Sequence, residues 1–173
     1  MLLLGKMLNV IGDIDISVNL FKEFESSLQK HEKNSINISS VNNKRLIVIS
    51  GEKSLVDRCS LFFKSKNISN RNLNVSAAFH SKLMLEGQIK FKELIKQYKF
   101  NKSFCNILST VNGQEIKINN LNDNEFDDII KYNLVEQFTE PIRLLENIKI
   151  CKENDIQVYE LVKKKFINFN DYL

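Results

Sequence analysis

The stretch INISSVNNKRLIVISG, residues 36–51, decides the fold of this chain. Isoleucines alternate with other residues on both sides of Asn42 and Asn43, and a period of two is typical of a strand with one buried face. Asparagine accepts the positive φ that tight turns need. The stretch therefore predicts a β-hairpin that turns at Asn42 and Asn43.

Helical patterns flank this hairpin on both sides. Residues 17–30, with Ser17 as N-cap, and residues 52–66 place apolar side chains at helical spacing, which predicts two helices with one buried face each. Short apolar runs at 5–12 and 71–76 predict the outer strands. The order over 5–76 is β-α-β-β-α-β, the ferredoxin-like motif, whose helices cover one face of a four-stranded antiparallel sheet.

The second half of the chain alternates helices with strands. Helical spacing predicts helices over 82–98, over 123–138 and from Pro141, at a first helical position, to about residue 152. Apolar runs predict strands at 105–111 and 156–162, with Cys105 in the core. We therefore expect an α/β (α+β) fold class with domains over 5–76 and 77–173.

Composition and charge exclude several function classes. The 173 residues are 43% hydrophobic with a net charge of +4, and no basic stripe with interleaved aromatic residues indicates nucleic-acid binding. The apolar start is too short to span a membrane and lacks signal-peptide features. Three lysines at 163–165 are typical of a solvated tail. The three cysteines stand far apart, so we expect no zinc site, no disulfide and a cytoplasmic location.

One histidine has a distinctive setting, NVSAAFHSKLM at residues 74–84. A strand gives way to a helix here, and α/β units place their chemistry at the carboxyl ends of strands. The small residues before His80 leave room for a substrate, which makes this imidazole a candidate general base. The alternative is a structural histidine packed among apolar neighbours.

A general base needs a nucleophile, and the sequence offers none that is evident. The strand–turn–helix pattern G-x-S-x-G is absent, and SGEKS at 50–54 has its serines in the wrong places. Ser81 is a poor candidate, because adjacent side chains in an extended turn point apart. The chain therefore predicts a base without its partner.

Four blocks together resemble the malonyl-CoA:acyl carrier protein transacylase family. VSAAFHSKLM (75–84) is similar to the family's V-S-x-x-F-H-S-x-L-M, and LVEQFTEPIRLLENI (134–148) to its L-x-x-Q-L-x-x-P-V-R-W-x-E-x-V. GKMLNVIG (5–12) and VNNKRLIVISGEK (41–53) resemble its G-x-M-x-x-V-I-G and N-S-P-G-Q-V-V-I-S-G-E-K. The blocks keep the family's order and cover nearly the whole chain.

The resemblance implies a fold and a missing part. Family members insert a ferredoxin-like subdomain, here 5–76, into an α/β-hydrolase-like acyltransferase core, whose C-terminal part is here 77–173 with an atypical tail from about 161. The family's G-H-S-x-G nucleophile, malonyl-binding arginine and oxyanion-hole donors precede the insert. The sequence then corresponds to the C-terminal portion of a split, truncated or misannotated enzyme, with no nucleophile in this chain.

The resemblance also assigns roles to site residues. His80 matches the general base, and Gln137 matches the residue whose main-chain carbonyl orients that base; its alternative is a helix-end surface residue. Phe79 matches a position linked to preference for malonyl over branched acyl groups, and a core aromatic is an equal alternative. Asn42 aligns with an asparagine at the cleft, or is simply a turn residue.

Departures from the family pattern also occur. The N-S-P-G-Q loop is NNKRL here, Thr110 and Leu144 replace a family asparagine and tryptophan, and the glycines and proline expected after Glu160 are absent. The implied function is malonyl transfer from coenzyme A to acyl carrier protein, with no cofactor and with a separate N-terminal half chain as a possible partner. The alternatives are an inactive remnant, a ferredoxin-like module that binds acyl carrier protein, and, more weakly, an RNA-binding domain that lacks the expected aromatic motif.

Overall fold

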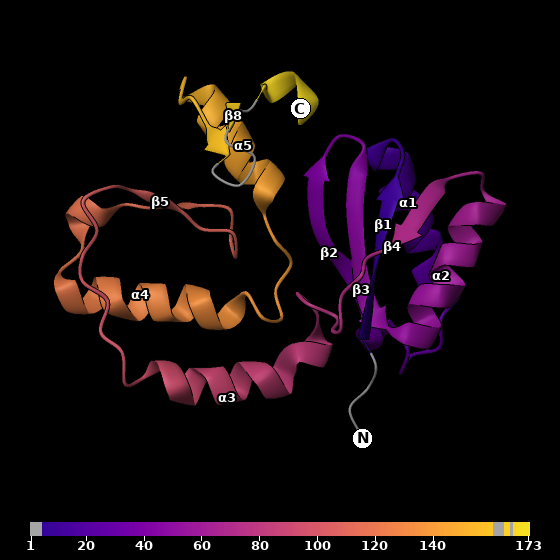
Figure 1. Ribbon diagram of the computed structural model, residues 1–173, viewed down its shortest axis with the longest axis horizontal. Coiled ribbons are helices and arrows are strands. Elements are labelled where there is room, and N and C mark those ends of the chain that lie inside the picture. The colour runs from indigo at the N-terminus through magenta and orange to yellow at the C-terminus, as the bar shows by residue number, and fades with distance from the viewer. Residues whose placement is uncertain (1–4, 161–164, 167) are drawn as a thin grey trace.

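The computed structural model describes residues 5–160, 165–166 and 168–173 (Figure 1). Within these residues the chain is a mixed α/β fold with one four-stranded antiparallel sheet, two short hairpins and five α-helices. None of the helices in this described part is long and apolar enough to cross a membrane.

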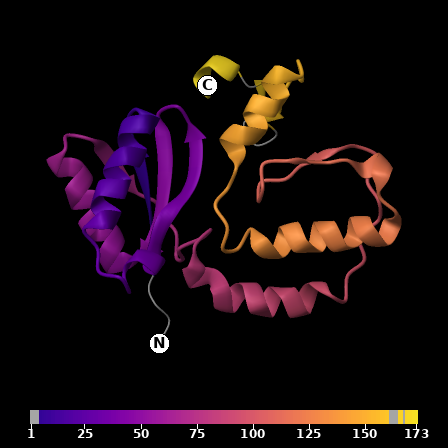
Figure 2. The same ribbon diagram turned by 180° about the vertical axis from the view of Figure 1, so that it is seen from behind.

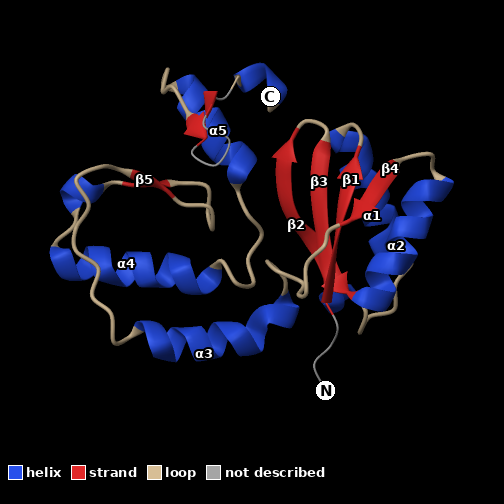
Figure 3. Cartoon of the chain, viewed as in Figure 1, coloured by secondary structure: helices blue, strands red, loops and turns tan. Residues whose placement is uncertain are grey.

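The first half forms the predicted ferredoxin-like unit. The strand order is β2-β3-β1-β4, and every neighbouring pair is antiparallel. Both helices lie on one face of the sheet and leave the other face turned toward the rest of the chain (Figure 3). The elements are β1 (Gly5–Ile11), α1 (Ile14–Ser26), β2 (Ile36–Asn43), β3 (Leu46–Glu52), α2 (Lys53–Ser65) and β4 (Ser69–Asn72).

The core lies between the sheet and these two helices. Alternate residues of the central strands point into it, as the period of two requires, and meet the helix residues that repeat at helical spacing. The fully or almost fully buried members are Leu8, Val10, Phe21, Phe24, Leu28, Ile36, Ile47, Ile49, Leu55, Val56, Cys59 and Phe63.

The boundaries of three elements in this unit differ from the predicted ones. The α1 helix begins at Ile14 because the Asp13 carboxylate accepts from the main-chain N–H groups of Asp15 and Ile16, and Ser17 is buried instead of capping. The hairpin turns at residues 44–45, where the Asn43 side-chain oxygen accepts from the Arg45 main-chain N–H at 2.8 Å. The β4 strand spans residues 69–72 instead of the predicted 71–76.

In the second half all three predicted helices are present, two of them with later starts than predicted, and the strands are much shorter. Helices α3 and α4 lie side by side in both views (Figures 1 and 2). The α4 helix carries a capping box formed by Asn122 and Glu125. The elements are α3 (Leu85–Ile95), β5 (Ile107–Leu108), β6 (Glu115–Ile116), α4 (Asp123–Glu136), α5 (Leu144–Glu153), β7 (Tyr159–Glu160) and β8 (Lys165–Phe166), with 3-10 turns at Lys33–Ser35, Lys82–Met84, Ile118–Asn120 and Phe169–Asp171.

Several predictions for this half are wrong in detail. Pro141 precedes α5 without joining it, because the next residue, Ile142, forms a parallel bridge with Ser40 of β2 and keeps the chain extended. The strand predicted at 105–111 keeps two residues, and Cys105 is exposed. The predicted strand 156–162 keeps only β7, and its last two residues lie outside the described part, as do 163 and 164 of the lysine run.

The buried ring of Phe63 tests the core. Phe63→Ala removes a side chain with no exposed surface, so we expect a loss of about 3–5 kcal/mol in the free energy of unfolding. Leu61→Ala on the same helix is the control, because 66% of Leu61 is exposed, and its effect should stay within about 0.5 kcal/mol. Urea denaturation followed by circular dichroism measures both, and equal losses would contradict this core.

A buried carboxylate ties α4 to the segment after α3. Asp127 accepts from Lys131 at 2.8 Å and from the Phe100 main-chain N–H at 2.8 Å, and these bonds lower the pKa of its carboxyl below its usual range. The folded-state pKa lies below the unfolded value, so the stabilisation is complete above the unfolded value of about 3.9 and is lost as the pH falls through the folded pKa.

Asp127→Asn should therefore lower the melting temperature at pH 7, and the difference from wild type should shrink as the pH falls through the lowered folded-state pKa of Asp127. Melting curves from pH 2 to pH 7 measure it. Asp128→Asn, at the exposed neighbouring carboxylate, is the control and should follow the wild-type curve. A difference that stays constant with pH would show that the Asp127 charge is not the cause.

Candidate functional site

The His80 loop runs from the sheet to α3 and passes the first residue of β1. The Leu73 main-chain N–H donates to the Met7 carbonyl at 2.9 Å and continues the pairing of β4 past its last residue. The loop then presses on Gly5, where an added Cβ atom would lie 2.7 Å from the Ala78 Cβ. Glycine at position 5 is what lets the loop approach the strand so closely.

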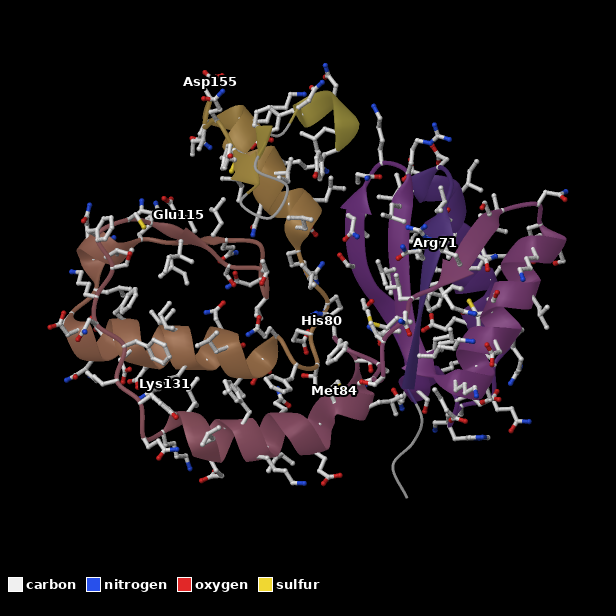
Figure 4. The ribbon with its side chains drawn as sticks, in the orientation of Figure 1. Arg71, His80, Met84, Glu115, Lys131 and Asp155 are labelled. Atoms are coloured by element: carbon white, nitrogen blue, oxygen red, sulfur yellow. The ribbon has the colours of Figure 1, made fainter. Side chains whose placement is uncertain are left out.

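The His80 side chain is held by the end of α4. Its Nδ1–H donates to the main-chain carbonyl of Gln137, the C-cap residue of α4, with 2.6 Å between the two atoms. A carbonyl can only accept, so the proton of the neutral imidazole sits on Nδ1 and Nε2 is left as the acceptor. Figure 4 shows His80 between the sheet and the end of α4. This is the arrangement that a general base requires.

A small hollow opens beside this imidazole. It has a volume of about 200 Å³ and is lined by Phe79, His80, Gln137 and Phe138. Phe79 is 41% exposed, so it borders the hollow and is not a core aromatic. Phe138 stacks on Phe91 of α3 at 5.0 Å between ring centroids, which fixes the opposite wall. The hollow brings three of the four predicted site residues together.

None of the four lining residues carries a hydroxyl or a thiol, and two candidates elsewhere in the chain are unsuited to attack. Ser81 is buried and its hydroxyl donates to the Ala78 carbonyl at 2.6 Å. Cys59 lies in the core, where burial raises the pKa of its thiol to about 12. A nucleophile for His80 is therefore not provided by these side chains.

The fourth predicted site residue, Asn42, does not line the hollow. Its side-chain oxygen accepts from the Ser40 hydroxyl near the hairpin end of β2. A larger hollow of about 230 Å³ between α3 and α4, lined in part by Lys92, Lys96 and Lys131, does not include His80 either. Among the described residues, no three His, Cys, Asp or Glu side chains gather to hold a metal ion.

Two residues that support the site, Gly5 and Asn37, cannot be recognised from the sequence pattern. The sequence pattern marks Gly5 only as the boundary of a strand, and Asn37 only as the outward position of an alternating strand. Asn37 donates to the His80 main-chain carbonyl at 3.0 Å. The alternation does place Asn37 on the sheet face away from the helices, but no local pattern names its partner 43 positions away.

Gly5→Ala tests whether the loop depends on this close approach. The added methyl group meets the Ala78 backbone, so we expect a loss of about 1–3 kcal/mol in the free energy of unfolding and a shift of the His80 ring resonances. Gly87→Ala is the control, because its Cβ would meet nothing closer than 3.6 Å. Alanine in place of glycine in a helix raises the free energy of unfolding by about 0.5–1 kcal/mol. Unchanged His80 resonances in Gly5→Ala would show that the contact does not position the loop.

Comparison with known proteins finds malonyl CoA-acyl carrier protein transacylases and polyketide biosynthesis proteins among the relatives of this chain. No protein-family model matches the chain. It is 28% identical over 134 residues to the polyketide biosynthesis malonyl CoA-acyl carrier protein transacylase BaeC of Bacillus velezensis, covering 75% of this chain and 44% of BaeC. It is 30% identical over 146 residues to the malonyl CoA-acyl carrier protein transacylase of Staphylococcus aureus MSSA476, covering 83% of this chain and 43% of that protein.

Solved structures agree at the level of fold. FabD from Acinetobacter baumannii superposes with a TM-score of 0.73 at 19% identity, over 89% of this chain and 46% of FabD. The malonyl-transacylase of a type II polyketide synthase, solved with its acyl-carrier protein, gives a TM-score of 0.70 at 21% identity, over 90% of this chain and 47% of that one. The chain spans less than half the length of these relatives and aligns with their C-terminal part.

Proposed function

The chain is a homologue of the malonyl-CoA–acyl carrier protein transacylases, and we propose that it supplies the general base for malonyl transfer from coenzyme A to acyl carrier protein. The observation that carries the proposal is the bond between His80 Nδ1 and the Gln137 carbonyl. In the neutral ring this bond places the proton on Nδ1 and leaves Nε2 as the acceptor, and Phe79 and Gln137 line a hollow beside the same imidazole. The proposed location is the cytoplasm.

The proposed reaction has two acyl-transfer steps that use His80 in both directions. In the first, Nε2 takes the proton of a serine hydroxyl as its oxygen attacks the malonyl thioester, and the proton passes to the departing coenzyme A thiol. In the second, Nε2 takes the proton of the carrier's phosphopantetheine thiol, whose sulfur attacks the malonyl ester. The serine oxygen leaves and regains the proton, so the chain ends unchanged.

We propose that the serine lies in polypeptide beyond these 173 residues, in a partner half chain or in a longer form of this protein. The side chains that line the hollow have no group that could take its place. The proposed division of labour puts a ferredoxin-like unit at 5–76 and part of the acyltransferase core at 77–173. Its tail from about 161 falls partly outside the described residues.

Phe79 and Asn42 are proposed to contact the acyl group and the cleft, respectively. Phe79 supports this assignment by its place on the wall of the hollow, where a bulky ring would crowd a methyl branch next to the thioester. Asn42 has no comparable support, because its side chain bonds within β2. We therefore expect selectivity against branched acyl groups to depend on Phe79 first.

His80→Asn tests the general base. Asparagine tolerates the left-handed backbone at this position and lacks a proton acceptor of suitable strength. In a mixture that reconstitutes transfer with a serine-bearing half chain, we expect a fall of about 10²–10⁴-fold in rate. His31→Asn, at the other histidine of the chain, which is exposed, is the control and should keep full activity.

Mass spectrometry of the chain alone gives the complementary outcome. Incubated with malonyl-CoA, the isolated chain should gain no covalent malonyl group. A stable adduct on the isolated chain would contradict the proposed division between base and nucleophile.

The second candidate function is non-enzymatic binding of acyl carrier protein. It is favoured by the hollow's lack of a nucleophile and by one structural relative solved in complex with its carrier. The net charge of +4 also suits an acidic partner. The His80→Asn variant separates the two functions. The binding function is supported if the variant keeps the carrier affinity of wild type and if no protein, wild type included, gives reconstituted transfer.

A further inference from the structure

The backbone of His80 is in an unusual conformation. Its φ is 57°, in the left-handed region that residues other than glycine rarely adopt. Such outliers persist only where the surroundings hold them, and they gather at functional sites. A group outside the loop must therefore favour this backbone over an ordinary one.

The group in contact with this backbone is the side-chain amide of Asn37, on β2. Its Nδ2 donates to the His80 carbonyl at 3.0 Å and to the Ile38 carbonyl at 3.2 Å. Both amide hydrogens are used. A flipped amide would place its oxygen against two carbonyl oxygens, which cannot donate, so Asn37 must be the donor in both bonds. Asn37 thus binds the backbone of residue 80, while Gln137 binds its ring.

These two bonds reach His80 from two separate elements. Asn37 belongs to the sheet and Gln137 to the end of α4, so the histidine lies between them with its main chain tied to one and its imidazole tied to the other. The backbone at residue 80 sets the direction of the Cα–Cβ bond and hence whether the ring can reach the Gln137 carbonyl. Without the Asn37 donor, we expect the backbone to return to its ordinary region and the ring to turn away from the Gln137 carbonyl.

We propose that Asn37 is a positioning residue for the His80 base, holding the left-handed backbone from which Nδ1 reaches the Gln137 carbonyl. The inference rests on the proposed function for its catalytic meaning, but the position of the ring is measurable without catalysis. It gives the ferredoxin-like sheet a role in the chemistry through one side chain on its open face.

The direct test is nitrogen-15 NMR of the full chain with labelled histidine, at a pH high enough for the imidazole rings to be neutral. Only two histidines contribute, so His31 is an internal reference in every spectrum. Wild type should show His80 in the Nδ1–H form. In Asn37→Ala and Asn37→Asp, we expect His80 to lose that signature and approach the spectrum of His31, with His31 itself unchanged.

Asn43→Asp is the matched control. It lies at the other end of the same strand, makes the same change of charge, and keeps the oxygen that accepts from the Arg45 N–H. Its His80 spectrum should equal that of wild type. Asn37→Ala introduces no charge, so it tests the proposal on its own if Asn37→Asp fails to fold. An unchanged His80 tautomer in folded Asn37→Ala overturns the proposal.

Kinetics of the reconstituted enzyme separate this inference from the proposed function. A displaced base should lower kcat by about tenfold or more with KM little changed, because a misplacement of about 1 Å is enough to slow a positioned reaction strongly. If Asn37→Ala changes the tautomer while wild type shows no transfer with any serine-bearing partner, Asn37 positions His80 and the proposed function fails. If transfer occurs and the tautomer does not depend on Asn37, the function stands and this inference fails.

Discussion

The arrangement of the whole site depends on one hydrogen bond, from the Nδ1–H of His80 to the main-chain carbonyl of Gln137. It joins residues 57 positions apart and brings the end of α4 to the loop that leaves the sheet. The acceptor is a backbone atom, so the bond tolerates changes of the side chain at 137 but not a change in where α4 ends. The position of that helix therefore determines where the His80 ring is held.

Magnitudes show why this bond needs support. A hydrogen bond contributes about 0.5–1.5 kcal/mol net, and a left-handed residue other than glycine costs about 1–2 kcal/mol. One bond to the ring does not clearly outweigh that cost. The bond from Asn37, the space left by Gly5 and the bond from Ser81 to the Ala78 carbonyl act on the same loop, and together they hold it. The rigid sheet beneath supplies the fixed frame.

The sequence predicted what local periodicity encodes. Alternation indicated the hairpin and helical spacing indicated α1 and α2, since core burial rewards both patterns directly. It placed the start of α1 wrongly because Asp13 and Ser17 are both competent caps, and only tertiary packing, which buries Ser17, decides between them. The two-residue strands and the extended Pro141 segment are set by partners elsewhere in the chain. Family resemblance placed His80 and Gln137, whereas Asn37 and Gly5 act through contacts that no local pattern contains.

Two of the departures from the family pattern, the hairpin loop and Thr110, lie where the main chain makes the contacts. The altered hairpin loop contributes through the carbonyls of Lys44 and Arg45, which accept from the Ile14 and Gly12 N–H groups at 3.0 Å each. Thr110 likewise accepts from the Arg143 N–H through its main chain at 2.8 Å. Main-chain contacts of this kind survive replacement of side chains. The imidazole at 80 has no such freedom, because its proposed role as a base lies in the ring itself, which the Gln137 carbonyl binds.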